Sequence, residues 1–171
     1  MNLHEYQAKE ILKAYGVPVP QGTVASTAKD AADAAAALGG SAWVVKAQVH
    51  AGGRGRAGGV KIVKSSRAAG EAAKNMLGTR LVTAQTGAAG IEVNRVYIEQ
   101  ACDVDQEIYL AALIDRSLGR VAFLASREGG ENIEETVTAQ PDMVNKLVVD
   151  PNVGLVPTDT QALVKNLGLS G

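Results

Sequence analysis

The chain has 171 residues, of which 46% are hydrophobic and 20% are charged, and its net charge at pH 7 is −1. This net charge excludes a general electrostatic attraction to nucleic acid or to anionic membranes. Aromatic residues make up only 4% of the chain, which argues against the base-stacking surfaces of RNA-binding proteins. The length suits one domain, or two small lobes, with a sizeable core.

Helical and extended patterns alternate in the first part of the chain. The expected helices cover 3–15, 28–38 and 66–77, and the expected strands cover 23–25, 43–47, 60–63 and 93–100. Asn2 is the expected N-cap of the first helix, and Thr27 forms a capping box with Asp30 at the second. Ser65 or Ser66 can cap the third helix. The second helix contains a run of alanines, which we expect to serve helix formation and packing only.

Hairpins dominate the rest of the chain. Strands are expected at 107–114 and 121–126, with a turn at 116–119 between them. The residues at 158–161 have the form of a capping box that opens a last helix, which we expect to end at Leu167.

The order of these elements predicts an α+β (mixed α/β) fold with two lobes, 1–102 and 103–171. The second lobe has only about three expected strands, whereas a typical sheet has roughly five. We therefore expect this lobe to be incomplete and the sequence to be the front part of a longer polypeptide.

Cysteine usage and the N-terminus predict the compartment. Cys102 is the only cysteine, so no internal disulfide can form and a reducing compartment is expected. The N-terminal residues lack a signal-peptide pattern, and no apolar run is long enough to span a membrane. We therefore expect a cytoplasmic protein, or a protein of the mitochondrial matrix if a presequence has been removed.

The segment 44–63 carries the strongest chemical signal. Two apolar runs flank a loop with five glycines and two arginines, Arg54 and Arg56, and Lys46 lies near the end of the first run. Glycines let the backbone approach a ligand closely. Arginine offers a planar fork of donors that suits phosphate oxygens, and lysine adds a compact positive charge. The pattern predicts a polyphosphate site, and an ordinary glycine-rich hairpin loop is the alternative.

Two better-known phosphate motifs do not fit this segment. The chain has no G-x-x-x-x-G-K-[ST] pattern, so the loop is not a Walker A loop. A G-x-G-x-x-G pattern occurs at 53–58, but a dinucleotide-binding fold needs a helix after it, and residues 60–63 have the pattern of a strand.

Four motifs resemble the β subunits of succinyl-CoA synthetase, the ADP-forming succinate–CoA ligase. They are NLHEYQAK at 2–9, VVKAQVHAGGRG at 44–55, RLVTAQT at 80–86 and DRS at 115–117. The resemblance implies an ATP-grasp fold, in which ATP and Mg²⁺ bind between two α+β lobes. It also implies a partner α subunit, which carries a phosphorylated histidine and binds most of the CoA. The implied reaction interconverts ATP, succinate and CoA with succinyl-CoA, ADP and phosphate.

The resemblance assigns nucleotide-binding roles to seven residues: Lys46, Gly53, Arg54, Gly55, Glu99, Cys102 and Glu107. Lys46 and the loop 53–55 would contact the phosphates, and Glu99 would lie in the adenine and hinge region. Cys102 would contact the base through its backbone, and Glu107 would accept hydrogen bonds from the ribose hydroxyls. We expect Lys46 to be exposed, so that its removal weakens ATP binding without unfolding the protein.

The resemblance also sets limits on these assignments. The family's Mg²⁺ ligands, an Asn and an Asp, lie beyond Gly171, as does the domain that meets the α subunit. We therefore assign neither a catalytic residue nor a metal ligand within the chain, and we expect the chain alone to be inactive. Pro20 resembles the ATP-preferring members, and His4 and His50 are expected to be structural.

Three other functions stay open at this point. Malate–CoA ligase β subunits share most of the four motifs, so the carboxylate substrate is open. A different ATP-grasp ligase would require the motifs to match by coincidence. A non-catalytic nucleotide-binding module would explain why no metal ligands are found among the matched motifs.

Overall fold

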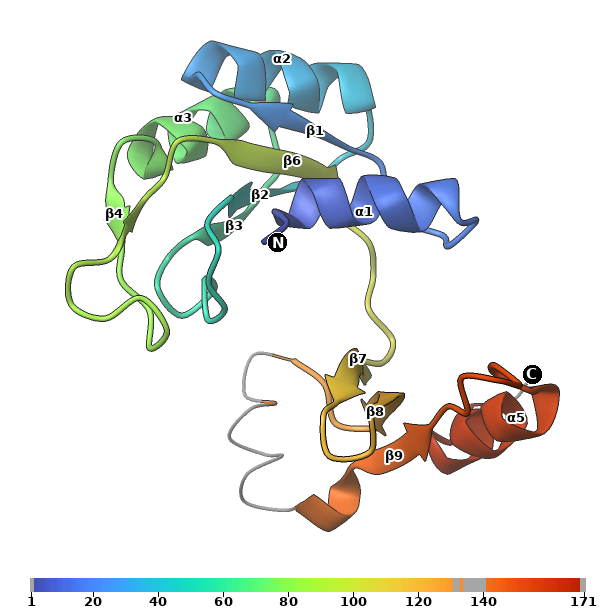
Figure 1. Ribbon diagram of the computed structural model, residues 1–171. Coiled ribbons are helices and arrows are strands. Elements are labelled where there is room, and N and C mark those ends of the chain that lie inside the picture. Colours follow the sequence, from blue (N-terminus) through green and yellow to red (C-terminus); the bar gives the residue numbers. More distant parts are fainter. Residues whose placement is uncertain (1, 131–132, 134–140, 170–171) are drawn as a thin grey trace. The chain divides into compact units, whose positions relative to one another are not determined.

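The computed structural model describes residues 2–130, 133 and 141–169 (Figure 1). Its contacts divide the chain into two compact units, Met1–Asp103 and Val104–Gly171, and each is described by itself. The boundary between the two lobes that was expected from the sequence, after Cys102, lies one residue earlier than this division. The mixture of helices and antiparallel strands confirms the α+β expectation.

The first unit is built from three helices, a four-stranded sheet and a two-stranded sheet. Its elements are α1 (Glu5–Ala14), β1 (Gly22–Ala25), α2 (Ala28–Leu38), β2 (Trp43–Ala47), β3 (Val60–Val63), α3 (Ser66–Met76), β4 (Arg80–Leu81), β5 (Ile91–Glu92) and β6 (Val96–Gln100). The four-stranded sheet has the order β1-β6-β2-β3, and every neighbouring pair is antiparallel. Strands β4 and β5 form the small sheet, which the sequence patterns did not predict.

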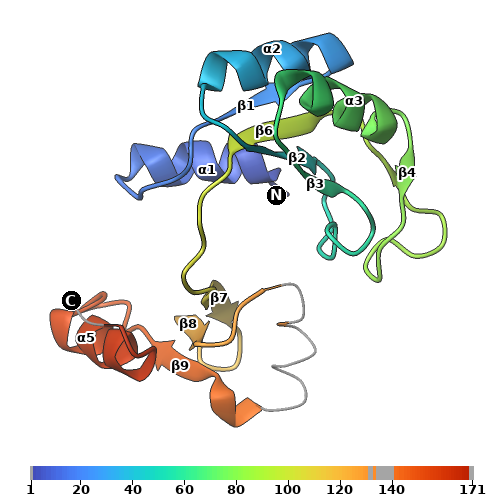
Figure 2. The same cartoon turned by 180° about the vertical axis from the view of Figure 1, so that it is seen from behind.

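The two faces of the four-stranded sheet have different roles. Helices α2 and α3 cover one face, and α1 lies on the other (Figures 1 and 2). Directly opposed residues of an antiparallel pair point to the same face. The register pairs Val45 with Ile98, and both are fully buried in the core toward α2 and α3. Lys46 and Glu99 are each one residue further along their strands, so both point to the face of α1.

Small side chains form the contact between α2 and α3. The buried members are Ala31, Ala34, Ala35, Ala69, Gly70 and Ala73. A Cβ added at Gly70 would lie 2.9 Å from the carbonyl oxygen of Ala28 and 3.2 Å from the Cβ of Ala32. The helix backbones therefore approach closely, which confirms that the alanine run serves packing.

Two of the predicted helix caps are confirmed. The Thr27 hydroxyl accepts a hydrogen bond from the backbone N–H of Asp30 at 3.0 Å. Ser65, rather than Ser66, caps α3 by accepting from the N–H of Ala68 at 3.1 Å. Each side chain satisfies a backbone donor that the helix leaves without a partner.

Two other predicted caps are wrong. Helix α1 begins at Glu5 with His4 as its N-cap residue, so Asn2 lies outside the helix. The side chain of Gln7 accepts from the N–H of His4 at 2.9 Å and closes this end. The last helix begins at Pro157, whose fixed φ angle suits a first helical position, so the predicted capping box at 158–161 lies inside the helix.

The second unit contains a three-stranded antiparallel sheet and one helix. Its elements are β7 (Tyr109–Asp115), β8 (Arg120–Ser126), η1 (Pro141–Met143), β9 (Asn145–Val148) and α5 (Pro157–Asn166). The strand order is β7-β8-β9. The carboxylate of Asp115 accepts from the N–H groups of Ser117 and Leu118, which closes the predicted hairpin turn. No helix in the described ranges is long and apolar enough to cross a membrane.

Candidate functional site

Five charged side chains meet on the α1 face of the sheet in the first unit. Glu5 and Lys9 come from α1, Lys46 from β2, Arg54 from the glycine-rich loop and Glu99 from β6. We call these five residues the ion-pair cluster. Roles were expected for Lys46, Arg54 and Glu99, and the structure brings these three together. No role was expected for Glu5 or Lys9, although both lie within the first matching motif.

Each carboxylate of the ion-pair cluster holds more than one cation. The ammonium of Lys46 donates to Glu5 Oε1 at 2.9 Å and to Glu99 Oε2 at 2.5 Å. The guanidinium of Arg54 donates to Glu5 Oε2 at 2.7 Å and to the carbonyl oxygen of Ala47 at 2.8 Å. Lys9 donates to Glu99 and lies 3.3 Å from Glu5. The cluster therefore ties α1, the loop and two strands together.

The electrostatics of the cluster favour the charged forms of Glu5 and Lys46. Burial alone would raise the pKa of Glu5, but the hydrogen bonds and charges of Lys46 and Arg54 outweigh it and lower the pKa to about 2. Burial would likewise lower the pKa of Lys46, but the hydrogen bonds and charges of Glu99 and Glu5 raise it above its usual value. Three cations and two carboxylates leave one net positive charge, which suits an anionic ligand.

Lys46 is not the exposed lysine that the sequence analysis expected. Its side chain is 20% exposed, and that of its partner Glu99 is 4% exposed. Removing the ammonium would leave Glu99 with Lys9 as its only ion-pair partner among the described residues. Breaking a buried ion pair in this way is costly, so loss of Lys46 should lower stability as well as ligand binding.

The glycine-rich loop closes on its own backbone. The N–H of Gly59 donates to the carbonyl of Arg54 at 2.7 Å, and that of Gly58 donates to Gly55 at 3.0 Å. Gly53 has a φ of 69°, in the left-handed region that favours glycine. The backbone at Gly59 packs tightly, because an added Cβ would lie 2.9 Å from the Leu81 side chain. Backbone hydrogen bonds and tight packing therefore fix the conformation of the loop.

A cavity of about 490 Å³ opens beside the loop and the ion-pair cluster. Its lining includes Glu5, Arg54, His50 and Gln85. The side chain of Gln85 accepts a hydrogen bond from the N–H of Gly52 at 2.7 Å, which fixes one wall against the loop. The cavity thus has the Arg54 guanidinium on its surface, and this group suits phosphate oxygens.

Two histidines lie at the same end of α1. The ring centroids of His4 and His50 are 4.0 Å apart. Burial, followed by the charges of His50, Arg95 and Arg54, lowers the pKa of His4. A neutral, half-buried ring at the start of the helix agrees with a structural role, which stays a prediction.

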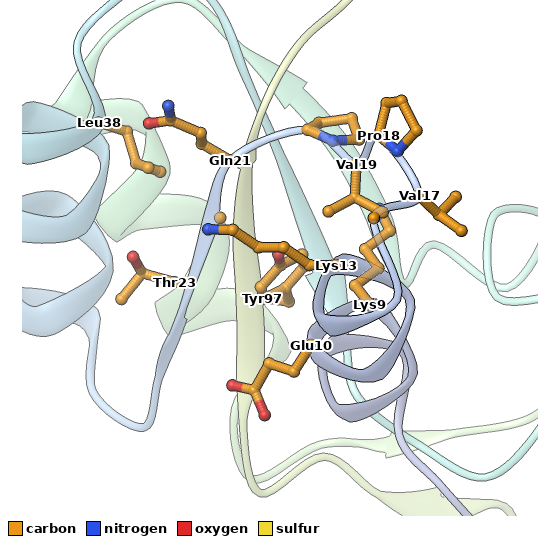
Figure 3. Close-up of a pocket in the computed structure, with 13 residues that line it drawn as sticks. Lys9, Glu10, Lys13, Val17, Pro18, Val19, Gln21, Thr23, Leu38 and Tyr97 are labelled. Carbon is orange, nitrogen blue, oxygen red and sulfur yellow. The ribbon is translucent and has the colours of Figure 1, made fainter.

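A second cleft, of about 780 Å³, lies at the other end of α1 (Figure 3). Lys9, Lys13 and Tyr97 line it, together with the extended segment 16–23. This segment includes Pro20, the residue that the resemblance connects with nucleotide choice.

The remaining predicted site residues lie outside the ion-pair cluster. Cys102 is exposed, follows the end of β6 and lines a separate hollow of about 380 Å³. Glu107 is exposed and belongs to the second unit. The structure joins Glu99 directly to Lys46, and Arg54 joins the same cluster through Glu5. The nucleotide-binding roles of all seven residues, including Cys102 and Glu107, stay predictions.

A divalent metal does not fit the described residues. They contain no group of three or more His, Cys, Asp and Glu side chains that could hold an ion. The carboxylates of Glu5 and Glu99 are already bound by cations. We therefore assign no Mg²⁺ ligand to this part of the chain.

Comparison with known families identifies the class of protein. The model of the ATP-grasp domain family matches residues 2–171, so the chain belongs to the ATP-grasp family. Among solved structures, the dinucleotide-forming acetyl-coenzyme A synthetase 1 of Ca. Korarchaeum cryptofilum, in complex with coenzyme A, Ca-AMPCP and HgCl+, gives a TM-score of 0.69 at 21% identity, covering 96% of this chain and 66% of that one. PH1788 from Pyrococcus horikoshii gives a TM-score of 0.68 at 22% identity, covering 95% of this chain and 63% of that one. These likenesses confirm the fold.

Curated relatives narrow the similarity to one kind of subunit. The chain is 50% identical to the β subunit of ADP-forming succinate–CoA ligase from Bdellovibrio bacteriovorus, over 99% of this chain and 44% of the relative. It is 51% identical to the corresponding β subunit from Coxiella burnetii, over 99% of this chain and 43% of that relative. The chain thus spans less than half the length of these relatives, and the expected resemblance is confirmed.

Proposed function

We propose that the chain is the nucleotide-binding part of the β subunit of an ADP-forming succinate–CoA ligase. The observation that carries this proposal is the ion-pair cluster, which places Lys46 and Arg54 together at an ordered glycine-rich loop. The β subunits that match over nearly the whole chain at about half identity support the choice of ligase.

In this proposal Lys46 and Arg54 bind phosphate oxygens of ATP or ADP. Phosphoryl transfer needs mainly positioning and stabilisation of charge, and this chain's cations and loop supply both. Glu99 would lie in the adenine and hinge region, Cys102 would contact the base through its backbone, and Glu107 would accept from the ribose. Mg²⁺ would neutralise charge on the phosphates, with ligands outside this chain.

The partners follow from the same proposal. An α subunit would supply the phosphorylated histidine, and succinate and CoA would be the further substrates of the complex. The reaction would belong to the tricarboxylic acid cycle, in the cytoplasm or in the mitochondrial matrix. The chain alone would bind nucleotide without turning over, because in this proposal the phosphorylated histidine and the metal ligands would be supplied from outside it.

Calorimetry with ATP tests the proposal. We expect Lys46→Met to weaken ATP binding about tenfold or more, because the variant loses a cation at the phosphates. Lys61→Met is the matched control, since Lys61 is exposed on β3 at the far side of the loop. Because Lys46→Met should also lower stability, the emission of buried Trp43 must show that the variant is folded. Equal ATP affinity in the wild type and Lys46→Met would refute the site.

A further inference from the structure

We propose that Glu5 is a positioning residue of the phosphate site, and that its carboxylate holds the Lys46 ammonium and the Arg54 guanidinium side by side for the nucleotide phosphates. The inference rests on the proposed function for the identity of the ligand. The bridge itself is seen in the structure, because one carboxylate oxygen of Glu5 accepts from Lys46 and the other accepts from Arg54.

The carboxylate of Glu5 lies between two cations, Lys46 and Arg54, that would otherwise repel each other. Two cations that must bind the same group of phosphates repel each other when no anion lies between them. The repulsion is larger in a half-buried site than in water, and the side chains of Lys46 and Arg54 are only 20% and 22% exposed. The carboxylate of Glu5 offsets this repulsion and fixes the separation of the two cations.

Lys46 and Arg54 have more N–H donors than their hydrogen bonds to the described residues use. An ammonium has three N–H donors, and among the described residues Lys46 uses one for Glu5 and one for Glu99. A guanidinium has five, and Arg54 uses one for Glu5 and one for the carbonyl of Ala47. Glu5 therefore orients both groups without occupying all of their hydrogen-bonding capacity.

Helix α1 is attached to the sheet face mainly through polar contacts. None of its residues is buried, so packing into the core does not explain its place. The N–H of Tyr6 donates to Gln48 at 3.3 Å, and the hydroxyl of Tyr6 accepts from Arg95 at 2.9 Å. These contacts hold the first turn of α1, and with it Glu5, over the phosphate site.

A comparable pair of charges occurs in another class of phosphoryl-transfer enzymes. In protein kinases a glutamate on a helix pairs with the strand lysine that contacts the nucleotide phosphates, and the pair must be in place for activity. Glu5 on α1 and Lys46 on β2 have the same relation here. The parallel concerns this pair of charges alone.

The test compares ligands with and without phosphates. Glu5→Gln removes the charge and one of the two bridging acceptors, so we expect about tenfold weaker binding of ATP and ADP by calorimetry. Adenosine has no phosphates, and its affinity should stay within about twofold of the wild type. Glu71→Gln is the matched control, because Glu71 is exposed on α3 at the opposite face of the sheet (Figure 1), and it should leave all three affinities unchanged.

A double-mutant cycle separates positioning from a general structural role. If Glu5 acts through Lys46, the effect of Glu5→Gln on ATP binding should shrink in the Lys46→Met background. An equal loss for ATP and adenosine, or an undiminished effect in that background, would show a structural role and overturn the proposal. Tighter ATP binding by Glu5→Gln would also overturn it, because Glu5 would then compete with the phosphates.

A second variant keeps the test decisive if Glu5→Gln does not fold. Glu5→Asp retains the carboxylate, but its shorter side chain cannot reach both cations, so ATP affinity should still fall by about threefold or more. Wild-type affinity in Glu5→Asp would refute the bridge. If Lys46→Met weakens ATP binding and the Glu5 variants do not, only this inference fails. If the wild type does not bind ATP, the proposed function fails with it.

Discussion

The ion-pair cluster predicts how the stability of the first unit depends on acid. Glu5 has a pKa of about 2 in the folded protein, against an ordinary value of 4.5. The unfolded chain therefore takes up this proton first as the pH falls. The stabilisation from ionised Glu5 is complete well above pH 4.5 and is lost as the pH falls toward 2. About 2 kcal/mol of it should disappear between pH 7 and pH 3.

Glu5→Gln isolates this contribution, because glutamine does not titrate. The variant should be less stable than the wild type at pH 7, since Lys46 and Arg54 lose a charged partner. The difference should narrow by about 2 kcal/mol at pH 3, because the wild type loses the same charge there.

Urea unfolding followed by tryptophan emission measures this difference. Trp43 is the only tryptophan and is 6% exposed in the core of the first unit, so its emission reports that unit alone. For Glu10→Gln, on the exposed side of the same helix, the difference in free energy of unfolding from the wild type should not change between pH 7 and pH 3. A constant difference between wild type and Glu5→Gln from pH 7 to pH 3 would mean that the cluster does not hold Glu5 ionised.

Three further predictions concern the core, a helix cap and the base. Ile98→Ala should lower the free energy of unfolding by about 2–5 kcal/mol, measured by Trp43 emission in urea, because Ile98 is fully buried between strand and helices. A loss near zero would place Ile98 outside the core. Thr27→Ala should cost about 1 kcal/mol in the same assay, with Thr27→Ser close to the wild type. ATP should displace a labelled ATP analogue better than GTP, through Pro20 and its neighbours, and equal displacement would contradict the base preference.

The local chemistry of the site could be predicted from the sequence. Lys46, Arg54 and the five glycines all lie within the segment 46–59, and their residue types alone indicate a phosphate site. Strands β2 and β3 on either side have clear apolar patterns, and both were placed with their observed ends.

Glu5 could not be predicted in this way. Its partners Lys46 and Arg54 lie 41 and 49 residues away along the chain. Their meeting depends on how α1 docks against the sheet, which no local pattern encodes. Only the inclusion of Glu5 in the first matching motif pointed to it. Strands β4 and β5 were missed for a different reason, because two residues are too few to show a period.

The contact between α2 and α3 has a consequence for the opposite face of the sheet. It is made of alanines and Gly70, so most substitutions there add volume, and overpacking costs about 1–3 kcal/mol. An added methyl group must either spread the helices or bend the strands beneath them. Those strands are β2 and β6, which carry Lys46 and Glu99 on their other side. Natural variants with larger side chains at the contact between α2 and α3 should therefore alter nucleotide affinity, although none of the residues that touch the ligand is replaced.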